Sequence, residues 1–153
     1  MAKEHERGYG QLSKNQLSKK QETELIRYNH ISYLLYLLSF FTFGITSLVA
    51  VFMNYSQRRE ADGTWLATHF DWQIKTFWYS LIITIVAFSI SLFGAGSIVG
   101  WLISIISSQP SPRIGMGAVL FFMLATFIFF FNALWYLYRI IKGWIALADG
   151  RPV

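Results

Sequence analysis

The sequence predicts an all-α integral membrane protein with three transmembrane helices and an interfacial helix that leads into the second. Two observations carry this prediction. Charged residues make up only 14% of the 153 residues, whereas soluble domains average about 25%. The chain also has three long segments without Asp, Glu, Lys or Arg, at 31–55, 76–112 and 114–138. Because about 20 apolar residues span a bilayer, each segment is long enough to cross a membrane.

Residues 1–30 differ in composition from the rest, and we expect a polar, basic and partly flexible N-terminal tail followed by a three-helix transmembrane domain over residues 31–153. The tail carries six Lys and Arg residues against four Glu. Ser18 and Gln21 have the spacing of a capping box, in which each side chain bonds the backbone N–H of the other residue. A helix is therefore expected to begin there and to run into the membrane.

The first span is predicted as one helix from about Ile31 to Met53. Tyrosines near its start are expected at the membrane interface, which amphipathic rings prefer: Tyr28, Tyr33 and Tyr36. Gly44 permits close approach of another backbone. Hydroxyl side chains recur on neighbouring turns and indicate interhelical packing, or else a polar transport path: Ser32, Ser39, Thr42 and Thr46.

The stretch from Gly63 to Trp78 combines aromatic and charged residues with a histidine before the second span. Thr64 can cap a helix start, and Trp65, His69 and Trp72 then project from one face. We interpret this segment as an interfacial helix or as the extramembrane start of the second span, with the aromatic rings as an interfacial belt. A polar stripe continues into the apolar sequence and is expected to face protein: His69, Gln73, Thr76, Ser80 and Thr84.

The second span, Phe77–Ser107, is long. As one helix it would extend about 46 Å, against a hydrocarbon core of about 30 Å. It therefore either tilts and protrudes or breaks at the glycines of residues 94–96. Gly96, Gly100 and Ser104 recur every fourth residue, a pattern typical of close helix packing within a chain or in a homodimer.

The third span is predicted from about Gly117 to Ile141, after a loop with Pro110 and Pro112. Near its end, Arg139 could reach Asp71, or the polar stripe through His69 and Gln73, and so hold the second and third spans together. On this hypothesis, Arg139→Ala and Asp71→Asn lower stability non-additively.

The basic residues flank the membrane spans, which is typical of orientation signals and of contact with anionic lipid. A three-span topology leaves six Lys and Arg residues near the membrane on the side of the charged loop and C-terminal tail, and five on the other. This difference does not decide the orientation, although we favour the charged loop and C-terminal tail inside. No basic stripe or module signature predicts binding to nucleic acid.

No pattern predicts an enzyme, a cofactor or a metal site. The chain has no cysteine, and its three histidines lack metal-ligand spacing. The glycines near residues 94–100 lack the strand context and the Lys of a phosphate-binding loop.

Two segments, Thr42–Trp78 and Ala133–Val153, resemble a family of small bacterial inner-membrane proteins, which is more distantly similar to Tic20-type subunits of the chloroplast import channel. The resemblance covers about 120 residues. Its central motif falls on Gly63, Thr64, Trp65, His69, Phe70, Trp72, Gln73, Phe77 and Trp78. Its terminal motif falls on Tyr136, Arg139, Gly143, Asp149, Gly150, Arg151 and Pro152. The long basic tail and the extended second span depart from the family. The resemblance implies a multi-pass protein of the bacterial inner (cytoplasmic) membrane, but no activity.

Three functional hypotheses follow. The first is a non-enzymatic scaffold or assembly subunit of a larger membrane complex, which contacts lipid and either a membrane-protein partner or further copies of itself. The second is a small oligomeric channel or transporter subunit with the polar stripe lining the path. The third, lipid sensing by the tail, depends on charge alone. The candidate interaction or packing residues are Trp65, His69, Asp71, Trp72, Gln73, Gly96, Gly100 and Arg139.

Overall fold

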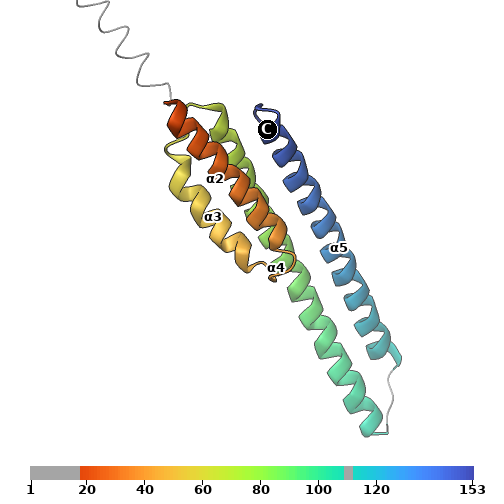
Figure 1. Ribbon diagram of the computed structural model, residues 1–153. Coiled ribbons are helices and arrows are strands. Elements are labelled where there is room, and N and C mark those ends of the chain that lie inside the picture. Colours follow the sequence, from red (N-terminus) through yellow and green to blue (C-terminus); the bar gives the residue numbers. More distant parts are fainter. Residues whose placement is uncertain (1–17, 109–111) are drawn as a thin grey trace, which may run out of the picture. The chain divides into compact units, whose positions relative to one another are not determined.

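The computed structural model describes residues 18–108 and 112–153, and every regular element within these ranges is a helix (Figure 1). The helices are α2 (Lys19–Leu38), α3 (Ile45–Arg58), α4 (Trp65–Ile106) and α5 (Pro112–Ala148). This arrangement confirms the all-helical class. Two helices, α4 and α5, are long and apolar enough to cross a membrane.

The chain divides into two compact units. The first unit contains the described residues up to Lys75 together with Ile140–Val153, and the second contains Thr76–Arg139. The first unit is therefore built from α2, α3, the start of α4 and the end of α5. The second consists of the remaining parts of α4 and α5 and their connection.

The predicted capping box at the start of α2 is confirmed. The Ser18 hydroxyl accepts from the backbone N–H of Gln21 at 3.3 Å, and the Gln21 side chain accepts from the backbone N–H of Ser18 at 3.1 Å. Two backbone donors that a helix start would leave unsatisfied are thereby paired. The remainder of the predicted tail, residues 1–17, lies outside the described residues.

The prediction of a single helix over Ile31–Met53 is wrong. α2 ends at Leu38, α3 begins at Ile45, and a turn over residues 39–44 separates them. The two helices pack side by side as a hairpin (Figure 1). The helix cannot continue because Phe43 and Gly44 adopt positive φ angles of 50° and 87°, which an α-helix does not contain. A charge-free window of 25 residues does not reveal such a turn.

The predicted second span is one uninterrupted helix. α4 contains 42 residues, or about 63 Å at the rise of an α-helix, and it does not break at the glycines of residues 94–96. The predicted interfacial helix is not a separate element, because Trp65 and the residues that follow form the first turns of α4.

In the second unit, α4 and α5 pack through small side chains and expose large apolar ones. Ala87 on α4 and Ala118 and Ala125 on α5 are buried. An added Cβ at Gly94 would lie 3.2 Å from the side chains of Phe121 and Phe122. Only 11% of the most apolar window of either helix is buried within the protein. An apolar surface of this extent is expected for helices that face lipid.

Candidate functional site

The polar side chains of the first unit converge on His69, which lies on the second turn of α4 and is fully buried. Its Nε2 lies 2.9 Å from the backbone carbonyl oxygen of Arg151, and its Nδ1 lies 3.1 Å from the hydroxyl of Tyr33. A carbonyl can only accept, so Nε2 carries the proton and Nδ1 accepts from the tyrosine in a neutral imidazole. His69 thus joins α2, α4 and the C-terminal segment.

A second group of buried polar side chains links α2, α3 and α4. The Asn54 Nδ2 donates to the Gln73 Oε1 at 2.8 Å and to the Tyr36 hydroxyl at 3.3 Å. Gln73 Nε2 in turn donates to Asn29 Oδ1 at 3.2 Å, and Asn29 Nδ2 donates to the carbonyl of Leu25 at 3.1 Å. All four polar side chains are fully buried. Amides supply both donors and acceptors, so these residues bond one another away from solvent, although the buried Oδ1 of Asn54 has no hydrogen-bond partner.

The end of α5 packs on the same region. Trp144 Nε1 donates to His30 Nδ1 at 2.9 Å, and the indole stacks on the ring of Tyr33 with an interplanar angle of 7°. Gly143 permits this approach, because a Cβ there would lie only 2.9 Å from Cζ of Tyr33. Tyr33 is therefore enclosed between α4 and α5 within the first unit.

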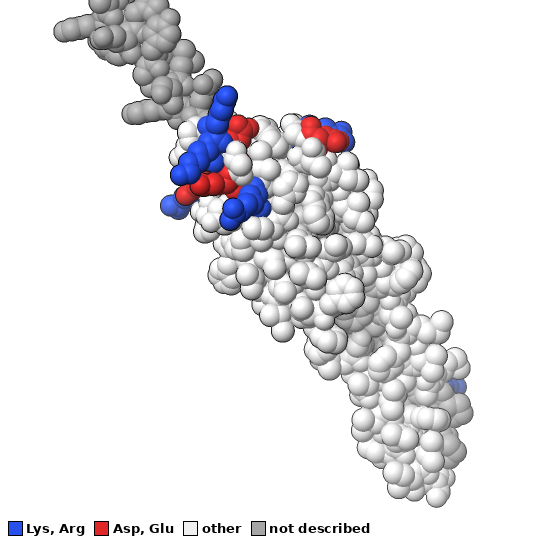
Figure 2. Space-filling view, in the orientation of Figure 1, with Lys and Arg blue, Asp and Glu red and all other residues white. Residues whose placement is uncertain are grey.

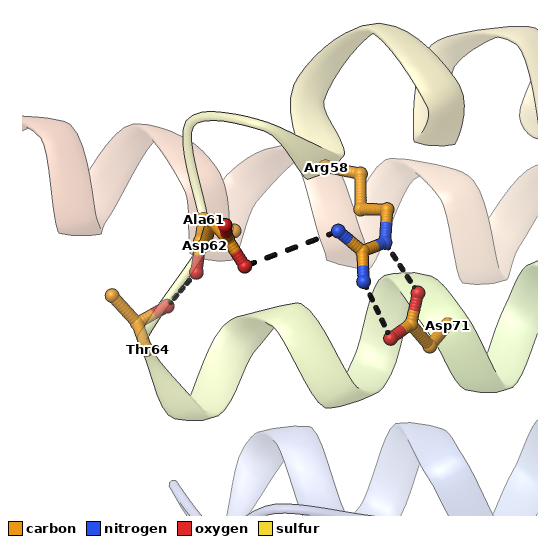
Figure 3. A network of polar contacts seen from close by, with 5 residues as sticks. All are labelled: Arg58, Ala61, Asp62, Thr64 and Asp71. Atoms are coloured by element: carbon orange, nitrogen blue, oxygen red, sulfur yellow. Dashed lines mark hydrogen bonds and ion pairs between the residues drawn. The ribbon is translucent and has the colours of Figure 1, made fainter.

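An ion pair lies beside this buried network. Arg58 at the end of α3 bonds both carboxylate oxygens of Asp71 on α4, through Nε at 2.5 Å and Nη2 at 3.0 Å (Figure 3). The hydrogen bond and the charge of Asp71 raise the pKa of Arg58 above its usual value. Asp62 is a more distant partner at 4.0 Å. Thr64 directly precedes α4, and its hydroxyl donates to the carbonyl of Ala61 at 2.6 Å, a bond to the preceding turn and not the predicted cap of the helix.

The polar stripe of α4 continues into the second unit, where it bonds α5. Arg139 Nε donates to Thr76 Oγ1 at 2.8 Å, and its guanidinium lies over the ring of Trp135. Asn132 Nδ2 lies 3.1 Å from the hydroxyl oxygens of both Ser80 and Thr84. The stripe therefore faces protein, and each of its five members hydrogen-bonds another residue of the chain.

The structure brings some predicted site residues together and separates others. Trp65 and His69 share a face as predicted, with ring centroids 5.5 Å apart, and Trp72 lies against the ammonium group of Lys142. Arg139 reaches the predicted stripe at Thr76, whereas Asp71 is bonded by Arg58 instead. The pairing differs because the turn in the hairpin brings the end of α3 beside Asp71.

Gly96 and Gly100, which the sequence predicted to pack against another helix, lie in different surroundings. A Cβ at Gly100 would contact the side chain of Ile114 on α5 at 3.7 Å, whereas nothing described lies within 4 Å of a Cβ at Gly96. Gly94 is closer to α5 than Gly100, because a Cβ there would lie 3.2 Å from Phe121 and Phe122. Since residues two apart on a helix point about 200° apart, Gly96 faces away from the surface that Gly94 packs.

Sequence reasoning missed several members of the network. Tyr33 and Tyr36 were expected at the membrane interface, but both are fully buried. Asn54 lies within a glycosylation sequon, and Asn29 and Trp144 belong to no recognised motif. A usable signal was the spacing of Asn29, Ser32, Tyr33 and Tyr36, which places polar groups on one face of α2.

The network offers amide, hydroxyl and imidazole groups. Among residues 18–108 and 112–153, no group of three or more His, Asp or Glu side chains could hold a metal ion. The arrangement can connect helices and fix their register. Comparisons with protein-family models, with curated proteins and with solved structures found no match.

Proposed function

We propose that the chain is a non-enzymatic, multi-pass protein of the bacterial inner membrane that serves as a scaffold or assembly subunit of a larger membrane complex. The observation that supports this proposal is that the polar side chains of α4 are buried or bond other helices of the chain. His69 and Gln73 of the first unit are fully buried, and Thr76, Ser80 and Thr84 of the second unit bond residues of α5. Polar side chains used in this way join helices to one another.

The surface around Gly96 supplies the second argument. Leu92, Val99 and Ile103 surround this glycine on the face of α4 turned away from Gly94, and all three are exposed. A glycine among apolar side chains lets a neighbouring helix approach closely. We propose that a helix of a partner protein packs there.

The channel hypothesis loses support from the same contacts. Residues that line a permeation path present their polar atoms to the path, whereas the stripe hydroxyls and amides bond within the chain. A channel would need these bonds to exchange for contacts with the permeant.

Photocrosslinking in native membranes tests the proposal. A photoreactive residue at Gly96 is expected to capture a discrete foreign membrane protein. The matched control is Val119 on α5, an exposed apolar position, where we expect lipid adducts. Capture of a second copy alone at Gly96 would favour a homo-oligomer, and lipid alone at both positions would contradict the assembly role.

A further inference from the structure

We propose that α2 and α3 form a re-entrant hairpin, which enters the membrane and returns to the same side without crossing. The start of α2, the α3–α4 connection and the end of α5 then lie on one side of the membrane. The proposal depends on the membrane location stated under the proposed function, but not on the assembly role.

The distribution of charge is the first observation. No Asp, Glu, Lys or Arg occurs between Arg27 and Arg58. In Figure 2, the charged side chains of the first unit lie where α2 begins, α3 ends and α4 begins, with a separate group at the end of α5. The opposite end of the hairpin carries apolar side chains, of which Phe41 is 82% exposed and Phe43 is 100% exposed. Exposed aromatic residues at a charge-free tip fit the hydrocarbon of a bilayer.

The lengths of the two arms decide between entering and crossing. From Arg27 to Leu38 the helix rises about 17 Å, and from Ile45 to Arg58 about 20 Å. The hydrocarbon core is about 30 Å thick. Each arm therefore reaches past the middle of the bilayer but does not reach its far side.

The hydrogen bonds of the turn suit this depth, since lipid cannot pair with backbone groups. Hydroxyl groups bond backbone carbonyls around the turn: Ser39 to Tyr36 at 2.6 Å, Thr42 to Leu38 at 3.3 Å, Ser47 to Gly44 at 2.6 Å and Thr46 to Leu35 at 2.9 Å. Bonds to a carbonyl three or four residues back occur in many helices. The bond from Thr46 is more informative, because it crosses from α3 to the last turn of α2.

Contacts at the charged end give the strongest support. Trp65 Nε1 on α4 donates to Glu22 Oε1 on α2 at 3.4 Å. His69 on α4 bonds the carbonyl of Arg151 after α5. A three-span topology would place Glu22 and Trp65 on opposite sides of the membrane, separated by about 30 Å of hydrocarbon. Their contact requires the same side.

The three-span prediction left the orientation undecided, because the two sides carried nearly equal numbers of Lys and Arg residues. The hairpin topology distributes these residues unequally. Of the ten Lys and Arg residues within the described ranges, only Arg113 then lies in the connection on the other side, which leaves nine (10 minus 1). By the positive-inside rule, the side with nine faces the cytoplasm. The hairpin thus assigns the orientation.

Cysteine accessibility tests the topology directly, because the chain has no native cysteine. We would introduce Thr23→Cys, Glu60→Cys, Ser107→Cys and Ala148→Cys singly, all at exposed positions. A membrane-impermeant maleimide is expected to label Ser107→Cys in spheroplasts and the other three only in inverted vesicles. Labelling of Thr23→Cys together with Ser107→Cys, opposite Glu60→Cys, would establish three spans and overturn the hairpin.

A depth measurement excludes a hairpin that stays outside the membrane. A nitroxide on Phe41→Cys in liposomes is expected to collide with oxygen at least several times more often than with a water-soluble nickel complex, and a nitroxide on Ser56→Cys is the matched control near the charged end. Frequent collision with nickel at both positions would overturn the proposal. Correct labelling without a crosslinked partner would remove the assembly role alone, and recovery in the soluble fraction would remove both.

Discussion

Gly143 is the residue at which the first unit leaves least space for a side chain. Replacing a helical glycine with alanine normally favours the helix by about 1 kcal/mol. Here the new Cβ would clash with the phenol of Tyr33, which is enclosed by Trp144 and His69 and cannot move aside.

We therefore expect Gly143→Ala to lower the free energy of unfolding in detergent by about 1–3 kcal/mol, a range typical of overpacking. Gly117→Ala is the control, because nothing described lies within 4 Å of its Cβ, and it should be neutral or stabilising. Equal effects of the two variants in a denaturant titration would contradict the enclosed position of Tyr33.

Asn54 and Gln73 form the bond on which the link between α3 and α4 depends. A double-mutant cycle with Asn54→Ala and Gln73→Ala is expected to give a coupling free energy of about 0.5–1.5 kcal/mol. Asn54→Ala combined with Asn132→Ala is the control pair, because these residues have separate partners, and it should be additive within about 0.5 kcal/mol. A coupling near zero for the first pair would mean that the bond contributes no stability.

The pair of Arg58 and Asp71 is more exposed, with 38% and 37% of the side chains accessible. Solvent screening limits such pairs, so Arg58→Met and Asp71→Asn should couple by less than about 1 kcal/mol and less at high salt. Because Arg139 bonds Thr76 instead, Arg139→Ala and Asp71→Asn are now expected to add. Strong non-additivity in that second cycle would support the pairing that the sequence predicted.

Among the elements, the turn between α2 and α3 depends most on one residue. Gly44 has a φ of 87°, a left-handed conformation that costs a residue with a Cβ about 1–2 kcal/mol. Gly44→Ala should lower the free energy of unfolding by about that amount, whereas Gly44→Asn should cost less, because Asn tolerates this region. Equal stability of Gly44→Ala and the unaltered protein, measured by denaturation in detergent, would mean that the turn relaxes.

α4 serves both units, because its first turns carry Trp65, His69 and Gln73 and its remainder carries the apolar surface. The helix continues through residues 94–96, so the glycines there do not end it. Gly94 lies against Phe121 and Phe122. Packing therefore accounts for Gly94, whereas nothing described lies within 4 Å of a Cβ at Gly96.

For the whole molecule, the extent of exposed apolar surface predicts how the protein partitions. We expect it to remain in the membrane pellet after alkaline carbonate extraction, because α4 and α5 are long and apolar enough to span the bilayer. A variant that lacks residues 1–17 is the control and should be retained equally. Release of the shortened variant alone would mean that the basic tail holds the protein at the surface.

The features that depend on neighbouring residues could be predicted from the sequence alone. These are the helical class, the long apolar segments of α4 and α5, and the start of α2 at Ser18. Local geometry is enough for each, because a capping box joins residues three apart and a membrane span is a continuous run.

Which distant residues contact one another depends on the tertiary structure. The tertiary structure places Tyr33 against His69, pairs Arg58 with Asp71, and divides the predicted first span into two helices. A hydroxyl or a carboxylate can pair with many groups, so its composition and spacing do not name its partner. The turn at residues 39–44 determines these partners. It folds α3 back along α2 and so brings Asn54 and Arg58 to the start of α4.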